Sequence, residues 1–225
     1  IPVSLDEILS ATKAVKRGAN RALIVSDMPY GSFHTGDNKA VSNALKLLKY
    51  GGAEAVKLEG GRNRVGLVKR LVDEEIPVMA HIGLTPQSVH KLGGYRVQGK
   101  TTDDAQRLIE DAKLLEEAGA FAIVLELVPR EIAEIITREV KISTVGIGAG
   151  PSCDIQVLVL HDLIGFTFGR QPRFVRQYAN VSQVITDAIS EWMDDVRSGE
   201  YPNESESYGM PEKVKLDELI STSAR

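Results

Sequence analysis

The chain is poor in cysteine, lacks long apolar runs and has no surplus of basic residues, and each shortage excludes a class of protein. A single cysteine, Cys153, stands among 225 residues, so no internal disulfide can form and a reducing, cytoplasmic location is expected. No apolar run reaches the roughly 18 residues that a membrane-spanning helix needs, so we expect no membrane partner. The net charge of −4 lacks the basic surplus of a nucleic-acid-binding protein, so no nucleic-acid partner is expected either.

What is present is a regular alternation of two patterns. Short, continuous apolar runs rich in β-branched residues predict buried parallel strands. They lie at 22–25, 53–56, 76–80, 121–125, 144–148 and 156–160. Apolar stripes of helical period predict helices at 5–17, 38–50, 103–118 and 174–196. Strands that alternate with helices predict an α/β fold with a parallel sheet or a (β/α)8 barrel.

A weak internal repeat favours the barrel. Residues 50–59 (YGGAEAVKLE) resemble residues 117–126 (EAGAFAIVLE), and each segment combines a helix end, a glycine, a strand of small residues and a glutamate. Such recurring units are more typical of a barrel than of a two-lobed sheet. We predict one barrel domain over 1–198, followed by a C-terminal arm over 199–225 with a short helix within 214–220.

Ionisable residues stand where the predicted strands end. Five such residues lie within three residues of the ends of four apolar runs: Asp27, Lys57, Glu59, His81 and Glu126. In parallel α/β proteins the carboxyl ends of the strands form the active face. Asp27 and Glu59 are hard oxygen donors that suit Mg²⁺. The alternative is a helix-capping aspartate and a solvated glutamate.

The other three residues each have a chemical and a structural interpretation. Lys57 lies two residues before Glu59, so both side chains share one strand face, where Lys57 can hold a substrate carboxylate or an oxyanion. The alternative is a simple ion pair. The apolar surroundings of Glu126 predict a raised pKa and a general base, whereas the alternative is a glutamate paired with Arg or Lys. His81 is either a hydrogen-bonding or acid–base group, or a structural histidine.

Taken together, these segments resemble the ketopantoate hydroxymethyltransferase family. The resemblance is carried by 27–32, 54–61, 77–88, 92–99, 118–129, 145–151 and 156–160. It implies a (β/α)8 barrel and a transferase that uses Mg²⁺. The implied reaction moves a hydroxymethyl group from the co-substrate 5,10-methylenetetrahydrofolate to 3-methyl-2-oxobutanoate. The product is 2-dehydropantoate (ketopantoate), and the step is the first of pantothenate and coenzyme A biosynthesis.

The resemblance also implies roles for individual residues. Asp27 matches a metal ligand that borders the substrate, Lys57 matches the residue that holds the 2-oxoacid, and Glu59 matches a metal-associated carboxylate. Glu126 matches the proton acceptor, and we assign His81 to substrate binding. The family further suggests a ring-like homo-oligomer, a decamer, with the C-terminal arm as a candidate contact.

The sequence departs from the family in two places. Ile155 stands where the family has glycine, which predicts a different local loop, because a β-branched residue disfavours positive φ. The family also has an earlier Gly-Asp-Ser segment with another metal ligand, which this sequence lacks. The six predicted strands would then be strands 3–8 of a barrel without its first βαβ unit. We expect either a gap at that place or a neighbouring chain that fills it, because open strand edges are a liability.

Two other functions compete with this one. The first is a different Mg²⁺-dependent enzyme that forms enolates of 2-oxoacids, such as a carbon–carbon lyase. The second is a non-catalytic, truncated paralogue that acts as an assembly subunit. The joint presence of Asp27, Lys57, Glu59 and Glu126 argues against the second alternative.

Overall fold

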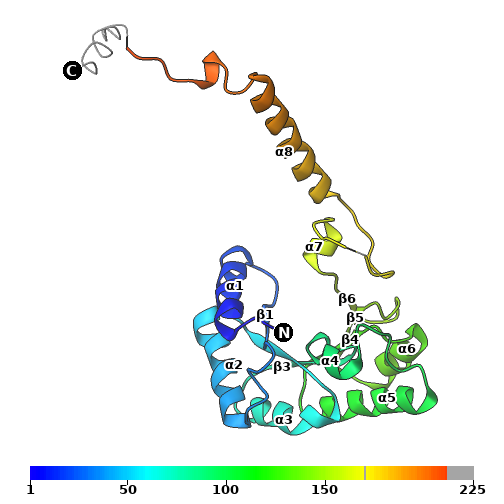
Figure 1. Ribbon diagram of the computed structural model, residues 1–225. Coiled ribbons are helices and arrows are strands. Elements are labelled where there is room, and N and C mark those ends of the chain that lie inside the picture. The colour runs from blue at the N-terminus through cyan, green and yellow to red at the C-terminus, as the bar shows by residue number, and fades with distance from the viewer. Residues whose placement is uncertain (170, 212–225) are drawn as a thin grey trace. The chain divides into compact units, whose positions relative to one another are not determined.

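The computed structural model describes residues 1–169 and 171–211, and the chain divides into two compact units, Ile1–Leu158 and Val159–Arg225. The first unit is built on one six-stranded parallel sheet (Figure 1). Its strands are β1 (Val25–Asp27), β2 (Ala55–Glu59), β3 (Val78–Gly83), β4 (Ala122–Glu126), β5 (Ser143–Ile147) and β6 (Ile155–Gln156).

The strands follow one another across the sheet in chain order, from β1 to β6. The strand order never changes direction across the sheet, as in a barrel, whereas a doubly wound sheet has a point where the order reverses. The predictions of an α/β fold, a parallel sheet and six strands are therefore confirmed. In the described part of the chain, β1 and β6 are the two edges of the sheet, so these residues form an open, curled sheet and not a closed (β/α)8 barrel.

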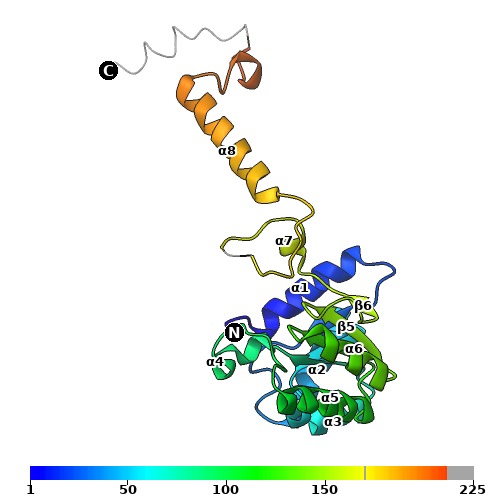
Figure 2. The same ribbon diagram turned by 90° about the vertical axis from the view of Figure 1, so that its right-hand side faces the viewer.

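Helices cover the outer face of the sheet (Figures 1 and 2). They are α1 (Leu5–Gly18), α2 (Asp37–Gly51), α3 (Val65–Asp73), α5 (Thr102–Glu117) and α6 (Arg130–Glu139), with the short α4 (Val89–Leu92) in the loop after β3. Local signals set their ends, since Ser4 and Glu7 form a capping box before α1 and Gly52 closes α2 with φ of 78°. The predicted helices 5–17, 38–50 and 103–118 are confirmed, whereas α3 and α6 were missed because each offers little more than two turns of periodicity.

Strand alternation separates the two faces of the sheet. In β4, Ile123 and Leu125 are fully buried against the helices, while Val124 and Glu126 face the inner cavity. The same alternation in β3 sends His81 inward. The helix side forms a continuous apolar core, in which Leu71 of α3 has no exposed surface. The period of two thus decides which ionisable side chains reach the inner face.

The strand ends differ from the predicted ones. The strands β1 to β4 run one to three residues further than the apolar runs, so Asp27, Glu59 and Glu126 are the last residues of their strands and His81 lies within β3. The predicted strand 156–160 is wrong: β6 is Ile155–Gln156, and Leu160 begins a helix. Ile155 pairs with Val145 in ordinary strand conformation, so it does not reproduce a glycine turn.

The second unit contains α7 (Leu160–Leu163), α8 (Val181–Ser198) and a 3₁₀ turn (Glu204–Glu206). The helix predicted over 174–196 is present but starts at Val181, where the Asn180 side chain caps it. The first compact unit ends at Leu158, before the predicted boundary at 198, so the place of 159–198 in a barrel domain stays a prediction. The helix predicted within 214–220 lies outside the described residues. No helix among the described residues is both long and apolar enough to cross a membrane.

The buried helix side predicts where stability is concentrated. We expect Leu71→Ala to lower the free energy of unfolding by about 2–5 kcal/mol, because it opens a cavity between α3 and the sheet. Leu45→Ala, at a position of α2 that is 39% exposed, is the matched control and should cost less than about 1 kcal/mol. Urea denaturation followed by circular dichroism measures both. Equal losses would contradict the packing described here.

Candidate active site

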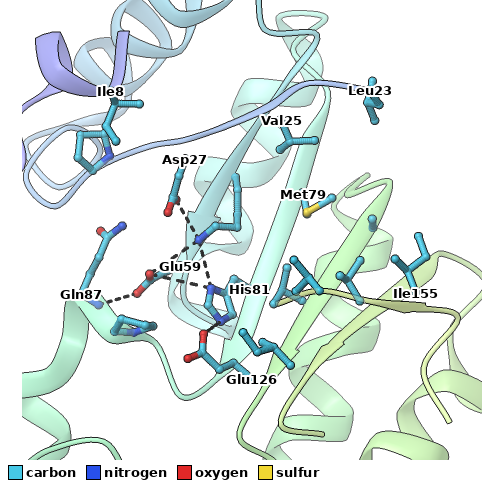
Figure 3. A pocket seen from close by; sticks show the side chains of 18 of the residues that line it. Ile8, Leu23, Val25, Asp27, Glu59, Met79, His81, Gln87, Glu126 and Ile155 are labelled. Atoms are coloured by element: carbon cyan, nitrogen blue, oxygen red, sulfur yellow. Dashed lines mark hydrogen bonds and ion pairs between the residues drawn. The ribbon is translucent and has the colours of Figure 1, made fainter. Parts of the chain in front are cut away.

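The carboxyl ends of β1 to β4 bring the five predicted residues into one cavity. Asp27, Lys57, Glu59, His81 and Glu126 all line a cavity of about 820 Å³ on the inner face of the sheet. Figure 3 shows Asp27, Glu59, His81 and Glu126 pointing toward a common centre. Parallel pairing explains the convergence, because Asp27 lies opposite Lys57 and Glu59 lies opposite His81 in register. The remaining wall is largely apolar.

The Lys57 ammonium is the hub of this cluster. Its Nζ lies 2.9 Å from Asp27 Oδ1, 3.8 Å from Glu59 Oε1 and 3.2 Å from His81 Nδ1. The prediction that Lys57 and Glu59 share a strand face is confirmed. Glu59 is buried, so it is not the solvated glutamate of the structural alternative. One positive charge therefore interacts with two carboxylates and an imidazole at the same time.

His81 connects Lys57 to Glu126. Burial, followed by the nearby Lys57 charge, lowers the pKa of His81 to about 3, so the ring is neutral at pH 7. Because an ammonium only donates hydrogen bonds, His81 Nδ1 must accept from Lys57, which leaves the ring proton on Nε2. This Nε2 lies 3.2 Å from Glu126 Oε2, in a contact too bent for a good hydrogen bond. The imidazole therefore presents a neutral N–H toward the Glu126 carboxyl group.

Both glutamates are held in a proton-accepting range. Burial raises the pKa of Glu126 to about 7, against a smaller lowering by Lys57, which is the direction predicted from its apolar surroundings. Burial also raises the pKa of Glu59 to about 7, although Lys57 and a hydrogen bond from the Gln87 N–H oppose the shift. A carboxylate with a pKa near neutral is well suited to general base catalysis.

The backbone around Glu126 is tightly constrained. The Leu84 N–H donates to the Glu126 carbonyl at 2.7 Å, and a Cβ at Gly83 would collide with that same carbonyl oxygen. The next residue, Leu127, has φ of 47°, a left-handed conformation rare for a leucine, and its N–H donates to Ile147. These contacts hold the end of β4, and with it the Glu126 side chain, in one position.

Gln87 is a site residue to which sequence reasoning gave no role. Its backbone N–H donates to Glu59 Oε2 at 2.9 Å, and its side-chain amide donates to the Met28 carbonyl at 3.0 Å. It thus connects the loop after β3 to the ends of β1 and β2. Nothing in the sequence distinguishes it from the polar residues beside it, because its role depends on where the loop folds back.

The site also offers ligands for a divalent cation. The described residues contain no cluster of three or more His, Cys, Asp or Glu side chains arranged for a metal. Mg²⁺ needs no such cluster, because it is commonly held by one or two carboxylates together with water and substrate oxygens. Asp27 and Glu59 fit this pattern. Glu59 fits it best, since desolvation opposes its ionisation and a cation would favour the charged form.

The fold and the site together define an α/β enzyme with a curled parallel sheet and an acid–base cluster at the ends of its strands. The family model described as "Ketopantoate hydroxymethyltransferase" matches residues 1–204, and the chain belongs to this family. A 3-methyl-2-oxobutanoate hydroxymethyltransferase of Koribacter versatilis (strain Ellin345) is 52% identical over 96% of this chain and 73% of its own length. One of Clostridium botulinum (strain Alaska E43 / Type E3) is 53% identical over 95% of this chain and 78% of its own.

Solved structures support the fold alone. A putative phosphonomutase from Burkholderia cenocepacia J2315 is similar with a TM-score of 0.50 at 9% sequence identity. The match covers 64% of this chain and 62% of that protein. At this identity the similarity concerns the arrangement of strands and helices, and it carries no information on chemistry.

The position of Lys57 predicts how the glutamates titrate. We expect Lys57→Met to raise the pKa of Glu126 and of Glu59 further, because the ammonium favours their charged forms and its removal takes away the charge that counteracts burial. Infrared or NMR titration of labelled glutamate carboxyl groups measures the change. Lys69→Met, on the outside of α3 beside Asp73, is the control and should leave both pKa values unchanged. A pKa of Glu126 that falls or stays constant in Lys57→Met would contradict the assigned geometry.

Proposed function

We propose that this chain transfers a hydroxymethyl group from 5,10-methylenetetrahydrofolate to 3-methyl-2-oxobutanoate, giving ketopantoate. Membership of the family, with relatives of that name at about half identity, supports the reaction. The single observation that carries the mechanism is Glu126, a half-buried carboxyl group with a pKa of about 7 that borders the cavity near the Lys57 cluster. A group of this kind suits removal of a weakly acidic C–H proton.

The Lys57 ammonium binds the oxygen end of the 2-oxoacid. The substrate carries a carboxylate and an adjacent keto oxygen, and both prefer a positively charged donor. Lys57 Nζ has three hydrogens, and its contact with His81 Nδ1 uses one of them. The other two hydrogens are available to Asp27 and Glu59, whose carboxylates lie at the cavity. When the substrate binds, these hydrogens can be donated to its oxygens instead.

Glu126 then removes the proton from C3. The proton passes to a carboxylate oxygen of Glu126, and the electron pair of the C–H bond moves into the enolate, whose oxygen lies at Lys57. The enolate carbon forms the new bond to the one-carbon unit of the donor. Water supplies the hydroxyl oxygen, and the two bonds from this carbon to the folate nitrogens break. One nitrogen takes up the proton held by Glu126 and the other takes up a proton from the water, so that tetrahydrofolate leaves. The neutral His81 ring lies beside Glu126 with its Nε2–H toward the carboxyl group. Because the pKa of His81 is well below that of Glu126, the ring does not take the proton from Glu126.

Asp27 and Glu59 are the residues that would hold Mg²⁺ in this scheme. Bound there, the ion would polarise the keto oxygen and make the C3 proton more acidic. The Gln87 N–H, which donates to Glu59 Oε2, orients the Glu59 carboxylate so that its other oxygen faces Lys57 and the cavity.

The role of Glu126 predicts the effect of its amide. We expect Glu126→Gln to lower the rate of deuterium exchange at C3 of 3-methyl-2-oxobutanoate by about 10²–10⁴-fold, since the amide cannot accept the proton. The measurement is NMR in D₂O with Mg²⁺ and without the folate donor. Glu134→Gln, on the exposed face of α6, is the control and should exchange at the wild-type rate. A rate of deuterium exchange that is the same in Glu126→Gln as in the wild type would overturn the assignment of Glu126 as the base.

The raised pKa of Glu126 predicts a pH profile. Only the deprotonated carboxylate can accept the C3 proton, so the exchange rate should fall about tenfold per pH unit below pH 7 and level off above it. The profile is measured at saturating substrate between pH 5 and about 9. A flat profile down to pH 5 would contradict a catalytic base with a pKa of about 7.

A further inference from the structure

A second, polar cavity adjoins the site and has no role in the mechanism above. It has a volume of about 170 Å³ and lies between the loops that follow β1, β2 and β3. Glu59 and Gln87 line both cavities, so the second cavity lies directly beside the reacting centre. A ligand bound at the reacting centre therefore has a second polar space next to it.

Arg64 supplies the main charge of this second cavity. Its guanidinium lies over the Phe33 ring, 5.0 Å from the ring centroid, and its Nε is buried without a hydrogen-bond partner. Among residues 1–169 and 171–211 it forms no ion pair. Gly60 permits this position, because a Cβ there would lie 2.6 Å from Arg64 Cγ. Stacking thus holds the cation in place while leaving its charge uncompensated.

The other charged groups leave the cavity positive. Lys91 of α4 lines it and is exposed at its rim. Asp111 also lines it, but its carboxylate is paired with Arg62 at 2.6 Å. Glu59 faces Lys57 on its other side. His34 accepts a hydrogen bond at Nδ1 from the Gly31 N–H, so its free Nε2 is a donor in the neutral ring.

We propose that this cavity is an anion subsite, in which Arg64 and Lys91 bind a carboxylate of the one-carbon donor. The inference rests on the proposed function and deepens it by naming where the donor is held. The folate donor carries its reactive carbon on one end and glutamate carboxylates on the other. The cavity is mostly polar and holds no more than a small group, which suits a carboxylate better than a ring system. Burial lowers the pKa of Arg64, and a bound anion offsets that desolvation.

The test compares two donors in four proteins, the wild type and the variants Arg64→Gln, Lys91→Gln and Arg64→Lys. The donors are 5,10-methylenetetrahydrofolate and its pteroate analogue, which lacks the glutamate. With the full donor we expect Arg64→Gln to raise the donor KM about tenfold and Lys91→Gln about two- to threefold. With the analogue, the wild-type KM should already be raised, and neither substitution should raise it further. Arg64→Lys, which keeps the charge, should recover part of the affinity for the full donor.

Two controls separate this subsite from the rest of the enzyme. Arg70→Gln removes the same charge from the outer face of α3, where Arg70 pairs with Glu74, and should leave the donor KM unchanged. Deuterium exchange at C3 in the absence of the donor reports on enolate formation alone. If the wild-type protein shows no such exchange, the result refutes the proposed function, whereas the subsite is tested by the donor KM. The KM for the 2-oxoacid should stay constant, because Lys57 and not Arg64 binds it.

Two results would overturn the subsite. One is a donor KM that does not respond to either Arg64→Gln or Lys91→Gln. The other is an equal rise with the full donor and with the pteroate analogue, which would show that Arg64 acts through the structure of the loop. Lys91 is exposed, so Lys91→Gln is not expected to disturb folding. If Arg64→Gln fails to fold, the donor KM of Lys91→Gln decides between the two outcomes.

Discussion

Because the strands are parallel, the ionisable residues at their carboxyl ends lie close together at one rim of the sheet, and the chemistry of this protein depends on how their charges are balanced. The Lys57 ammonium supplies the balancing charge, since it contacts Asp27, Glu59 and His81 within 4 Å. One cation shared among these groups cannot fully offset their desolvation. The site is therefore left with carboxyl groups that titrate near neutral pH.

This incomplete compensation is useful for catalysis. A fully paired glutamate would be a weak base at neutral pH, whereas burial brings the pKa of Glu126 and of Glu59 to about 7. The same burial keeps His81 neutral, so its Nδ1 accepts a hydrogen bond from Lys57 and the ring adds no second positive charge. Backbone contacts at Gly83, Leu84 and Leu127 keep Glu126 from turning away to solvent.

Much of the fold could be predicted from local patterns. The continuous apolar runs identified the parallel strands, and the helical stripes identified three helices of the first unit, because both patterns reflect burial. Predictions failed where burial gives a weak signal. Helices α3 and α6 are short, and the apolar run 156–160 continues past Gln156 into α7, where periodicity cannot separate a strand from a helix.

The sequence by itself determined the chemical types at the site and their order along the chain. Asp27, Lys57, Glu59, His81 and Glu126 were identifiable because charged groups at the ends of buried runs are costly without a purpose. Only the tertiary structure decided which groups touch. The register that sets Glu59 opposite His81, the turn that brings Gln87 to Glu59 and the stacking of Arg64 on Phe33 all join residues from separate loops and strands. Distances between such segments depend on packing of the whole sheet, which no local pattern records.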